Sequence, residues 1–327
     1  VARLSDVEHR PARVLESVDA RGLRRFVRAL EEGVVFGHDD ILAGAGPGTA
    51  ELQLGLWSST GIAELELGGP RGDRWNAKLE RGRSGRNLPS WSSAVQYRYH
   101  HPMFIAETFT SLQGEGMLVG VPSFFIRTSG CNLRCRWCDT PYTSWLPEGG
   151  RRTVDELLAE AEGSGVRHVV VTGGEPLLQR ELGELTRRLR AAALHVTVET
   201  AGTRDPDFEC DLLSLSPKTV NSDPQGNWRD RHRRLRSDPE PLGRLLGRFP
   251  EYQLKFVVTD ADDLSEIAAL VAGIGGIDPS RVLLMAEGRS AAEVAEKAPM
   301  VAALCSEHGF RYTPRLHLDL FGGGRGV

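Results

Sequence analysis

The sequence has few cysteines, no long apolar run and no strong excess of charge of either sign. Only 5 of its 327 residues are cysteine, too few for a disulfide-stapled scaffold of this length. No run of about 18 apolar residues occurs, so a membrane-spanning helix is not predicted. The formal net charge of -4 provides no general attraction to nucleic acid or to an acidic membrane. We therefore expect a cytoplasmic protein with a small-molecule substrate, and no direct nucleic-acid partner.

Lysine is also scarce, since the chain has only Lys78, Lys218, Lys255 and Lys297. Arginine supplies the rest of the positive charge. A lysine within a motif is therefore more informative here than in an average sequence, and Lys218 is such a residue.

The cysteines that are present are crowded. Cys131, Cys135 and Cys138 form a C-x3-C-x2-C array. A loop of this length can turn three thiolates toward one centre, and thiolates are the ligands of iron–sulfur clusters. A [4Fe–4S] cluster held by three cysteines keeps one iron open for chemistry, so we predict such a cluster here.

A zinc site or a set of inert thiols would also be compatible with three close cysteines. A structural zinc site uses similar ligands, but it normally has four of them arranged as two spaced pairs, and no second pair follows. The thiols could also have no metal at all. Cys210 and Cys305 stand alone in apolar surroundings and are expected to be small buried hydrophobes.

The first 102 residues differ from the rest of the chain. They contain no methionine, and segments 44–48 and 69–89 are rich in glycine, arginine or serine. We predict an N-terminal extension over 1–102 that is poorly ordered or an over-long gene start. An accessory domain is the alternative. Residues 103–327 are predicted to form the catalytic domain.

Beyond residue 103, short apolar segments alternate with helical segments. Strands are expected at 122–127, 168–172, 195–199, 212–216, 253–258 and 282–286. This alternation predicts an α/β fold with parallel strands, in the form of an incomplete (β/α)6-type TIM barrel. The cysteines, the turn 173–176, Glu199 and segment 216–218 each follow or end a strand. The active site is therefore expected at the carboxyl ends of the strands.

Two motifs in this order resemble those of the radical S-adenosylmethionine (SAM) superfamily. They are the three cysteines and the turn 172–176 (Thr-Gly-Gly-Glu-Pro). Further segments resemble the 7-carboxy-7-deazaguanine synthase family and extend the likeness over 103–327. They include 109–116 (Phe-Thr-Ser-Leu-Gln-Gly-Glu-Gly), 138–140 (Cys-Asp-Thr) and 216–218 (Ser-Pro-Lys), of which 112–116 and 138–140 are the most distinctive.

The family resemblance implies a reaction. The cofactors would be a [4Fe–4S] cluster, SAM and Mg²⁺. A 5′-deoxyadenosyl radical would take hydrogen from C6 of 6-carboxy-5,6,7,8-tetrahydropterin. Ring contraction with loss of ammonia would give 7-carboxy-7-deazaguanine, on the route to queuosine or other 7-deazapurines. A flavodoxin-like or ferredoxin-like electron donor and a homodimer are also implied.

The resemblance also assigns roles to residues. Cys131, Cys135 and Cys138 would hold the cluster, and Thr140 would bind Mg²⁺. The substrate would contact Leu112, Gln113, Gly114, Glu115, Arg127 and Thr172, with the Arg127 guanidinium suited to pair with a carboxylate. SAM would contact Trp137, Cys138, Asp139, Gly174, Glu199, Ser216, Pro217, Lys218 and Met285.

Two rival functions are compatible with parts of the sequence. A glycyl-radical-enzyme activating enzyme belongs to the same superfamily, but segment 112–116 and Arg127 favour a small carboxylated substrate. A noncatalytic metal-binding module associated with RNA is a second alternative. It would use the basic run 229–236, which we predict instead to be a solvated helix face because aromatic residues do not interleave it.

Overall fold

The computed structural model describes residues 102–236 and 238–326, and in the first hundred residues it describes only the backbone of seven strands. The chain divides into two units, Val1–His101 and Pro102–Val327. In the first unit an antiparallel sheet has the order β1 (Leu15–Val18), β2 (Ala50–Leu56), β3 (Ala63–Gly68), β4 (Arg74–Leu79) and β7 (Arg98–His100), and β5 (Arg81–Gly82) pairs with β6 (Ser90–Trp91). The prediction of a poorly ordered extension or an over-long gene start concerns this first unit. Apart from the strands named above, its residues lie outside the part of the chain that the structure describes.

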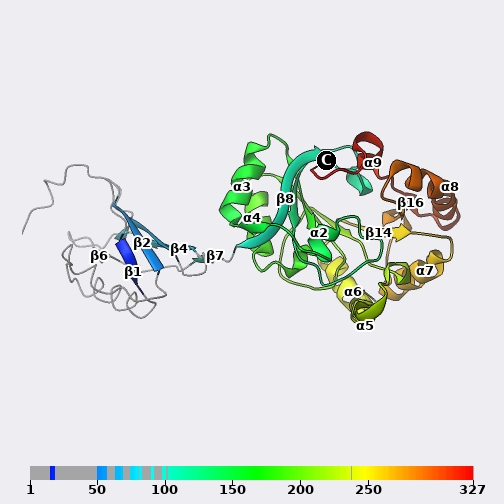
Figure 1. The fold of residues 1–327 in the computed structure, drawn as a ribbon, viewed down its shortest axis with the longest axis horizontal. Coiled ribbons are helices and arrows are strands. Elements are labelled where there is room, and N and C mark those ends of the chain that lie inside the picture. The colour runs from blue at the N-terminus through cyan, green and yellow to red at the C-terminus, as the bar shows by residue number, and fades with distance from the viewer. Residues whose placement is uncertain are drawn as a thin grey trace, which may run out of the picture. The chain divides into compact units, whose positions relative to one another are not determined.

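The second unit is built on a nine-stranded sheet in the order β10-β8-β9-β11-β12-β13-β14-β15-β16 (Figure 1). Seven neighbouring strands run parallel, and β8 and β10 are antiparallel at one edge. The bounds are β8 Met103–Leu112, β9 Pro122–Thr128, β10 Gly150–Arg152, β11 His168–Gly173, β12 His195–Thr200, β13 Leu212–Leu215, β14 Tyr252–Val258, β15 Val282–Ala286 and β16 Arg311–Tyr312. The sheet does not close, so the predicted incomplete barrel is confirmed.

The six predicted strands are β9 and β11 to β15. They were predictable because parallel strands buried on both faces are nearly continuous apolar runs. In β15 every residue is buried, and in β14 only Tyr252 is partly exposed. Strands β8, β10 and β16 were not predicted. β10 and β16 are the edge strands of the sheet, and β8, which lies between β10 and β9, mixes polar with apolar residues along its length.

Helices connect the strands and cover the sheet. They are α2 Pro141–Ser144, α3 Val154–Gly163, α4 Leu182–Ala191, α5 Arg229–Arg236, α6 Pro239–Arg248, α7 Asp263–Ile274, α8 Ala291–His308 and α9 Leu316–Phe321. Figure 1 shows α8 beside β16, where the two elements are in contact. Helix α3 begins with a capping box, in which the Thr153 hydroxyl accepts from Glu156 N–H and the Glu156 carboxylate accepts from Thr153 N–H.

The hydrophobic core lies between the sheet and these helices. Its largest fully buried side chains include Phe256 of β14, Ile126 of β9 and Leu213 of β13. Because the core fixes all the parallel strands, the loops at their carboxyl ends converge on one region. No helix in the described part of the chain is long and apolar enough to span a bilayer.

Candidate active site

A cavity of about 430 Å³ lies at the carboxyl ends of the parallel strands. Its walls come from β8, β9, β11 to β15, and the segment that ends the chain. Six basic residues line it against three acidic ones other than cysteine: Arg127, Lys218, Lys255, Arg289, Arg315 and Arg325 against Glu115, Asp139 and Glu199. This surplus of positive charge suits anionic ligands.

The loop after β9 brings all three clustered cysteines to the cavity wall. Its backbone is held from outside: Arg134 N–H donates to His232 Nδ1 at 3.0 Å, and Arg136 N–H donates to the Ser222 carbonyl at 3.0 Å. The Arg134 side chain adds bonds to two carbonyls of the same loop, at 2.6 and 2.7 Å. We call residues 131–138 the cluster loop.

The environment of the thiols fits metal-bound thiolates. Burial raises the pKa of Cys131 and of Cys135 to about 12, with nearby carboxylates acting in the same direction. The thiolates therefore need a cation, which a cluster provides. Within 102–236 and 238–326, no three His, Cys, Asp or Glu side chains are grouped to hold a single metal ion. A cluster spreads its thiolates over separate irons, so three cysteines can hold it without meeting at one ion.

The glycine turn after β11 packs directly on the cluster loop. Gly174 N–H donates to the Thr128 carbonyl at 2.9 Å, and Glu175 N–H donates to the Gly130 carbonyl at 2.9 Å. A Cβ at Gly174 would lie 2.3 Å from the Gly130 carbonyl oxygen. Only glycine therefore fits at this position, and the backbone edge of the turn borders the cavity.

Glu175, in the same turn, is fully buried and was not predicted as a functional residue. Its carboxylate accepts bonds from Leu177 N–H at 3.1 Å, from Ala201 N–H at 3.0 Å and from the Thr200 hydroxyl. Burial raises its pKa despite these bonds. Glu175 thus ties the turn to the end of β12. Ala201 takes part through its backbone N–H.

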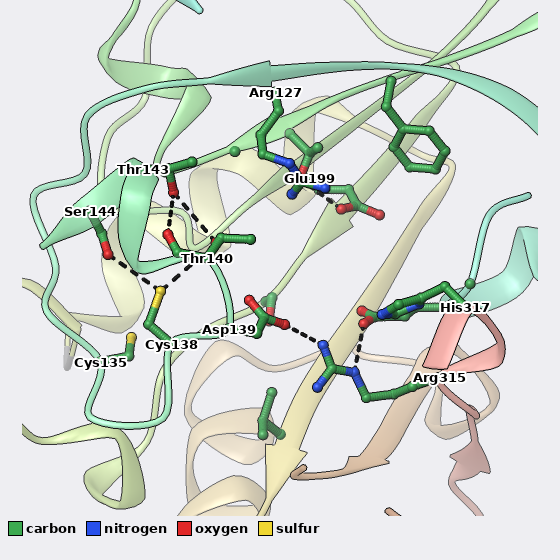
Figure 2. Close-up of a pocket in the computed structure, with 18 of the residues that line it drawn as sticks. Arg127, Cys135, Cys138, Asp139, Thr140, Thr143, Ser144, Glu199, Arg315 and His317 are labelled. Atoms are coloured by element: carbon green, nitrogen blue, oxygen red, sulfur yellow. Dashed lines mark hydrogen bonds and ion pairs between the residues drawn. The ribbon is translucent and has the colours of Figure 1, made fainter. Parts of the chain in front are cut away.

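Four charged side chains form a chain across one wall of the cavity. Arg315 pairs with Asp139 of the segment after β9 (Figure 2). Its Nε lies 3.1 Å from Glu115, which also pairs with Lys255 of β14. Burial alone would raise the pKa of Glu115, but Lys255 and Arg315 hold it well below its ordinary value. Burial also opposes the lowering of the Asp139 pKa by Arg315.

Arg127, at the end of β9, points into the cavity. Its Nε lies 2.7 Å from Glu107 Oε1, and the same oxygen accepts from the Tyr142 hydroxyl at 2.7 Å. The guanidinium also lies over the Phe109 ring, 5.4 Å from its centroid. Arg127 is therefore held by one carboxylate through Nε while part of its fork faces the cavity.

Glu199, at the end of β12, is held on two sides. Its Oε1 accepts from Gln113 Nε2 at 3.0 Å, and its Oε2 accepts from the Thr172 hydroxyl at 2.9 Å. The site thereby brings together three residues that are widely separated in sequence. Figure 2 shows Glu199 on the Arg127 side of the cavity, away from Cys135 and Cys138.

Hydroxyl groups surround Cys138. Its sulfur lies 3.3 Å from Ser144 Oγ and 3.8 Å from Thr140 Oγ1, and the Thr143 hydroxyl donates to the Thr140 carbonyl at 2.9 Å (Figure 2). Hydrogen bonds to the sulfur of a cluster ligand are one way in which a protein tunes the cluster potential. Thr140 itself lines the cavity.

Ser216 and Lys218 follow the end of β13 and lie opposite the cluster loop. Lys218 Nζ donates to the Ser216 hydroxyl at 2.7 Å and lies 5.6 Å from the centroid of the Trp137 ring. The Trp137 indole donates to Asn221 at 3.2 Å, which fixes its orientation. An aromatic ring, a hydroxyl and an ammonium group are thus presented together to the cavity.

The C-terminal segment also enters the site. Arg315, His317 and Arg325 line the cavity, and Arg325 lies 3.6 Å from the centroid of the Tyr142 ring. A Cβ at Gly326 would lie 4.0 Å from Phe109 Cβ in β8, so the chain end crosses to the first strand of this unit. Burial lowers the pKa of His317, against the pull of Glu115.

The structure brings nearly all of the predicted site residues to one cavity. The predicted residues that line it are Leu112, Gln113, Gly114, Glu115, Arg127, Cys131, Cys135, Trp137, Cys138, Asp139, Thr140, Thr172, Gly174, Glu199, Ser216, Lys218 and Met285. Pro217 is buried but is not among the lining residues. The ligand assigned to each residue remains a prediction.

Sequence reasoning missed Glu107, Lys255 and Arg315 as site residues. Their roles depend on partners far away in sequence, which no local pattern reveals. The scarcity of lysine was a usable signal for Lys255, because only four lysines occur. The basic run, predicted to be a solvated helix face, forms α5, in which His232 and Arg236 are buried on the other side.

Comparison with known proteins places this site in a family. Residues 125–259 match the model of the Radical SAM superfamily. The chain is 45% identical over 229 residues to the 7-carboxy-7-deazaguanine synthase of Rhodopirellula baltica, an alignment that covers 69% of this chain and 89% of that protein. It is 47% identical over 231 residues to the 7-carboxy-7-deazaguanine synthase of Halobacterium salinarum, covering 66% of this chain and 90% of that protein.

A solved structure agrees with these relatives. The crystal structure of QueE from Escherichia coli is similar with a TM-score of 0.52 and 25% sequence identity, covering 66% of this chain and 95% of that one. The matched residues include the cluster loop and the glycine turn, whose geometry fits a radical SAM enzyme. The chain therefore belongs to the 7-carboxy-7-deazaguanine synthase family of the radical SAM superfamily.

Proposed function

We propose that this protein converts 6-carboxy-5,6,7,8-tetrahydropterin into 7-carboxy-7-deazaguanine with loss of ammonia, as a step of queuosine or other 7-deazapurine biosynthesis. The observation that carries the proposal is a single cavity lined both by the three clustered cysteines and by Arg127. Family membership supports it, because the matched relatives bear this activity in their name.

The residues fit a [4Fe–4S] cluster and SAM. Three thiols line the cavity, and the glycine turn leaves a backbone edge beside them that a larger side chain would block. When bound, the cluster and SAM supply a 5′-deoxyadenosyl radical that removes a hydrogen atom from the substrate. Trp137, Ser216 and Lys218 offer a ring surface, a hydroxyl and a cation to the cofactor, and Lys218 can neutralise a carboxylate.

Arg127 and Glu199 are proposed to hold the pterin. A substrate carboxylate would either replace Glu107 as the partner of Arg127 or bind to the same guanidinium beside Glu107. The guanidinium has N–H donors besides Nε that can serve this purpose. Gln113 and Thr172 fix the Glu199 carboxylate, which can accept N–H groups of the pterin. Glu115 remains an anion at neutral pH beside Lys255 and Arg315, so it too can accept but not donate.

We further propose that Thr140 contributes to a Mg²⁺ site. Its hydroxyl lines the cavity near Cys138. Mg²⁺ prefers oxygen ligands and takes few of them from protein, leaving the remainder to substrate and water. One hydroxyl at the edge of an anion-binding cavity fits this pattern.

The partners proposed for the enzyme are a flavodoxin-like or ferredoxin-like electron donor and a second copy of the chain. The compartment proposed is the cytoplasm, and residues 103–327 are proposed as the catalytic domain. The family relatives support this boundary, because about two thirds of the chain accounts for 89% of the Rhodopirellula baltica protein.

Anaerobic turnover tests the proposed function. The reconstituted protein is incubated with dithionite, SAM, Mg²⁺ and 6-carboxytetrahydropterin, and the products are separated by chromatography with mass detection. We expect 7-carboxy-7-deazaguanine from the natural chain. The Cys135→Ala variant should form neither this product nor 5′-deoxyadenosine, because a cluster ligand is lost. Formation of 5′-deoxyadenosine by the natural chain without the deazapurine would refute the proposed substrate.

A further inference from the structure

An arginine-rich surface lies against the cluster loop on the side away from the cavity. It consists of Arg134 and Arg136 of the loop and Arg229, Arg231 and Arg234 of α5, and we call it the arginine face. All but Arg134, which is half-buried, are exposed. None of the five lines the cavity.

The cluster loop separates the arginine face from the cavity. Cys131, Leu133, Cys135 and Trp137 line the cavity, whereas the intervening residues, including Arg134 and Arg136, do not. From Cys131 to Trp137, every second residue of the loop therefore lines the cavity, and Cys138 lines it as well. A protein bound to the arginine face would be one loop away from the cluster.

Helix α5 is fastened to this loop by hydrogen bonds. Arg134 N–H donates to His232 Nδ1 at 3.0 Å, so His232 Nε2 carries the ring proton and faces Ser222 Oγ at 2.9 Å. Arg236 anchors the other end of the helix to Asp223 at 2.6 Å and to Glu266 at 2.8 Å. His232 and Arg236 thus fasten the buried side of α5, whereas Arg229, Arg231 and Arg234 are exposed.

No described carboxylate neutralises the positive charge of the arginine face through an ion pair. Arg134 and Arg231 both lie over Trp228, at 4.2 and 5.3 Å from its ring centroid. Among the described residues, no carboxylate forms an ion pair with any of the five arginines. Asp230 is the one acidic residue inside α5. Guanidinium groups gathered in this way favour an anionic partner.

Resting on the proposed function, we propose that the arginine face is the docking surface for an acidic one-electron donor protein of the flavodoxin or ferredoxin type. In the step that it serves, the reduced donor loses one electron and the [4Fe–4S]²⁺ cluster gains it to become [4Fe–4S]⁺. No atom is transferred at the surface. Charge complementarity would steer the encounter and place the donor beside the cluster loop.

An RNA partner fits the surface less well. Single-stranded nucleic acid is usually held by aromatic platforms interleaved with basic residues. Trp228 lies beside the arginine face, but Arg134 and Arg231 already cover its ring. The substrate of the proposed reaction is also a free pterin, which requires no RNA at the cluster loop.

The test is the double variant Arg231→Glu/Arg234→Glu, assayed with two reductants. With an acidic flavodoxin reduced to its hydroquinone, the apparent KM for flavodoxin should rise about tenfold or more, and the salt dependence of the natural enzyme should largely disappear. With dithionite, product formation should be unchanged, because neither residue touches the cavity. A matched control is Arg167→Glu/Arg311→Glu, which makes the same charge change at exposed positions at the amino ends of β11 and β16. It should behave as the natural enzyme does with both reductants.

Each other outcome overturns the docking proposal. An unchanged KM for flavodoxin would show that the donor binds elsewhere. An equal loss with dithionite would show damage to the site instead of lost docking. Loss of tRNA binding with normal flavodoxin turnover would assign the surface to RNA. Failure of the natural chain to form product with dithionite would instead refute the proposed function, so the two failures are distinguishable.

Discussion

Arg127 links the charge pattern of the cavity to the proposed substrate. The residue forms an ion pair with Glu107, while its side chain lines the cavity. A hydrogen bond to a charged group contributes about 1.5–3 kcal/mol. Binding of a carboxylated pterin should therefore depend strongly on this single side chain.

We expect Arg127→Met to raise KM for the pterin about 10- to 150-fold, because the substrate carboxylate loses its charged partner. Binding of SAM, measured by equilibrium dialysis, should be unaffected. Arg127→Lys should recover only part of the loss, since an ammonium cannot reproduce the two-pronged contact. A normal KM in Arg127→Met would show that the carboxylate binds elsewhere.

Thr140 is the residue on which the metal proposal depends. We expect turnover to fall severalfold after rigorous removal of divalent cations and to return with Mg²⁺, because substrate oxygens lose a shared counterion. Thr140→Val removes the hydroxyl at nearly constant volume and should weaken the Mg²⁺ dependence, while Thr143→Val serves as a neighbouring comparison. Full activity without any divalent cation would contradict the assignment.

His232 is the residue through which α5 supports the cluster loop. Burial lowers its pKa from 6.5 to about 4. Between these values the unfolded chain takes up a proton that the folded chain does not, so the contribution of His232 to stability is complete above pH 6.5 and is lost as the pH falls toward 4. Protonation of Nδ1 would also break its bond with Arg134 N–H.

The expected result is that His232→Asn flattens the pH dependence of apoprotein stability between pH 7.5 and 5, and lowers stability at pH 7.5 by about 1–3 kcal/mol. Urea unfolding at the two pH values measures both effects. The exposed His308 provides the comparison, and His308→Asn should keep the natural slope. An unchanged slope in His232→Asn would contradict the role of this histidine.

One of the turns beside the cavity has no room for a larger side chain than glycine. The glycine turn after β11 meets the cluster loop through backbone contacts, so the two elements must move together. A Cβ at Gly174 would also come within 2.6 Å of the Thr143 carbonyl oxygen. Backbone on both sides leaves little room for adjustment.

For this reason Gly174→Ala should displace the cluster loop, with reduced iron content after reconstitution and a loss of about 1–3 kcal/mol in apoprotein stability. Iron analysis and urea unfolding provide the two readouts. Gly243→Ala in α6 is the matched control, because a Cβ there meets no atom within 4 Å and alanine favours helix. Equal iron content and equal stability in both variants would show that the turn tolerates the added methyl group.

At the level of elements, the sequence contains enough information for the central strands but not for the edges. Strands β11 and β15 are continuous apolar runs, and their period and length identify them. Strand β8 alternates irregularly between buried and exposed residues, and β16 has only two residues. Such segments become strands because a neighbour pairs with them, which a local pattern does not record.

For the whole molecule, long-range pairing explains what could and could not be predicted about the site. The cysteines and the glycine turn are local motifs, so their chemistry could be predicted. The pairing of Arg315 with Asp139 joins residues 176 positions apart, and that of Lys255 with Glu115 joins residues 140 apart. These contacts follow from the order of strands in the sheet and not from any single segment.

The same long-range order brings the C-terminal segment into the cavity. Arg325 pairs with Glu148 at 3.0 Å and stacks on Tyr142, so the end of the chain closes over the loop that follows β9. Both halves of the second unit thus contribute to one cavity. We propose that this cavity positions C6 of a carboxylated pterin for hydrogen-atom removal.

The most direct test uses 6-carboxytetrahydropterin that carries deuterium at C6. The reconstituted enzyme is incubated anaerobically with this substrate, dithionite, SAM and Mg²⁺, and the 5′-deoxyadenosine is analysed by mass spectrometry. We predict 5′-deoxyadenosine that is heavier by one deuterium, formed together with 7-carboxy-7-deazaguanine. Unlabelled 5′-deoxyadenosine without the deazapurine product would contradict this account.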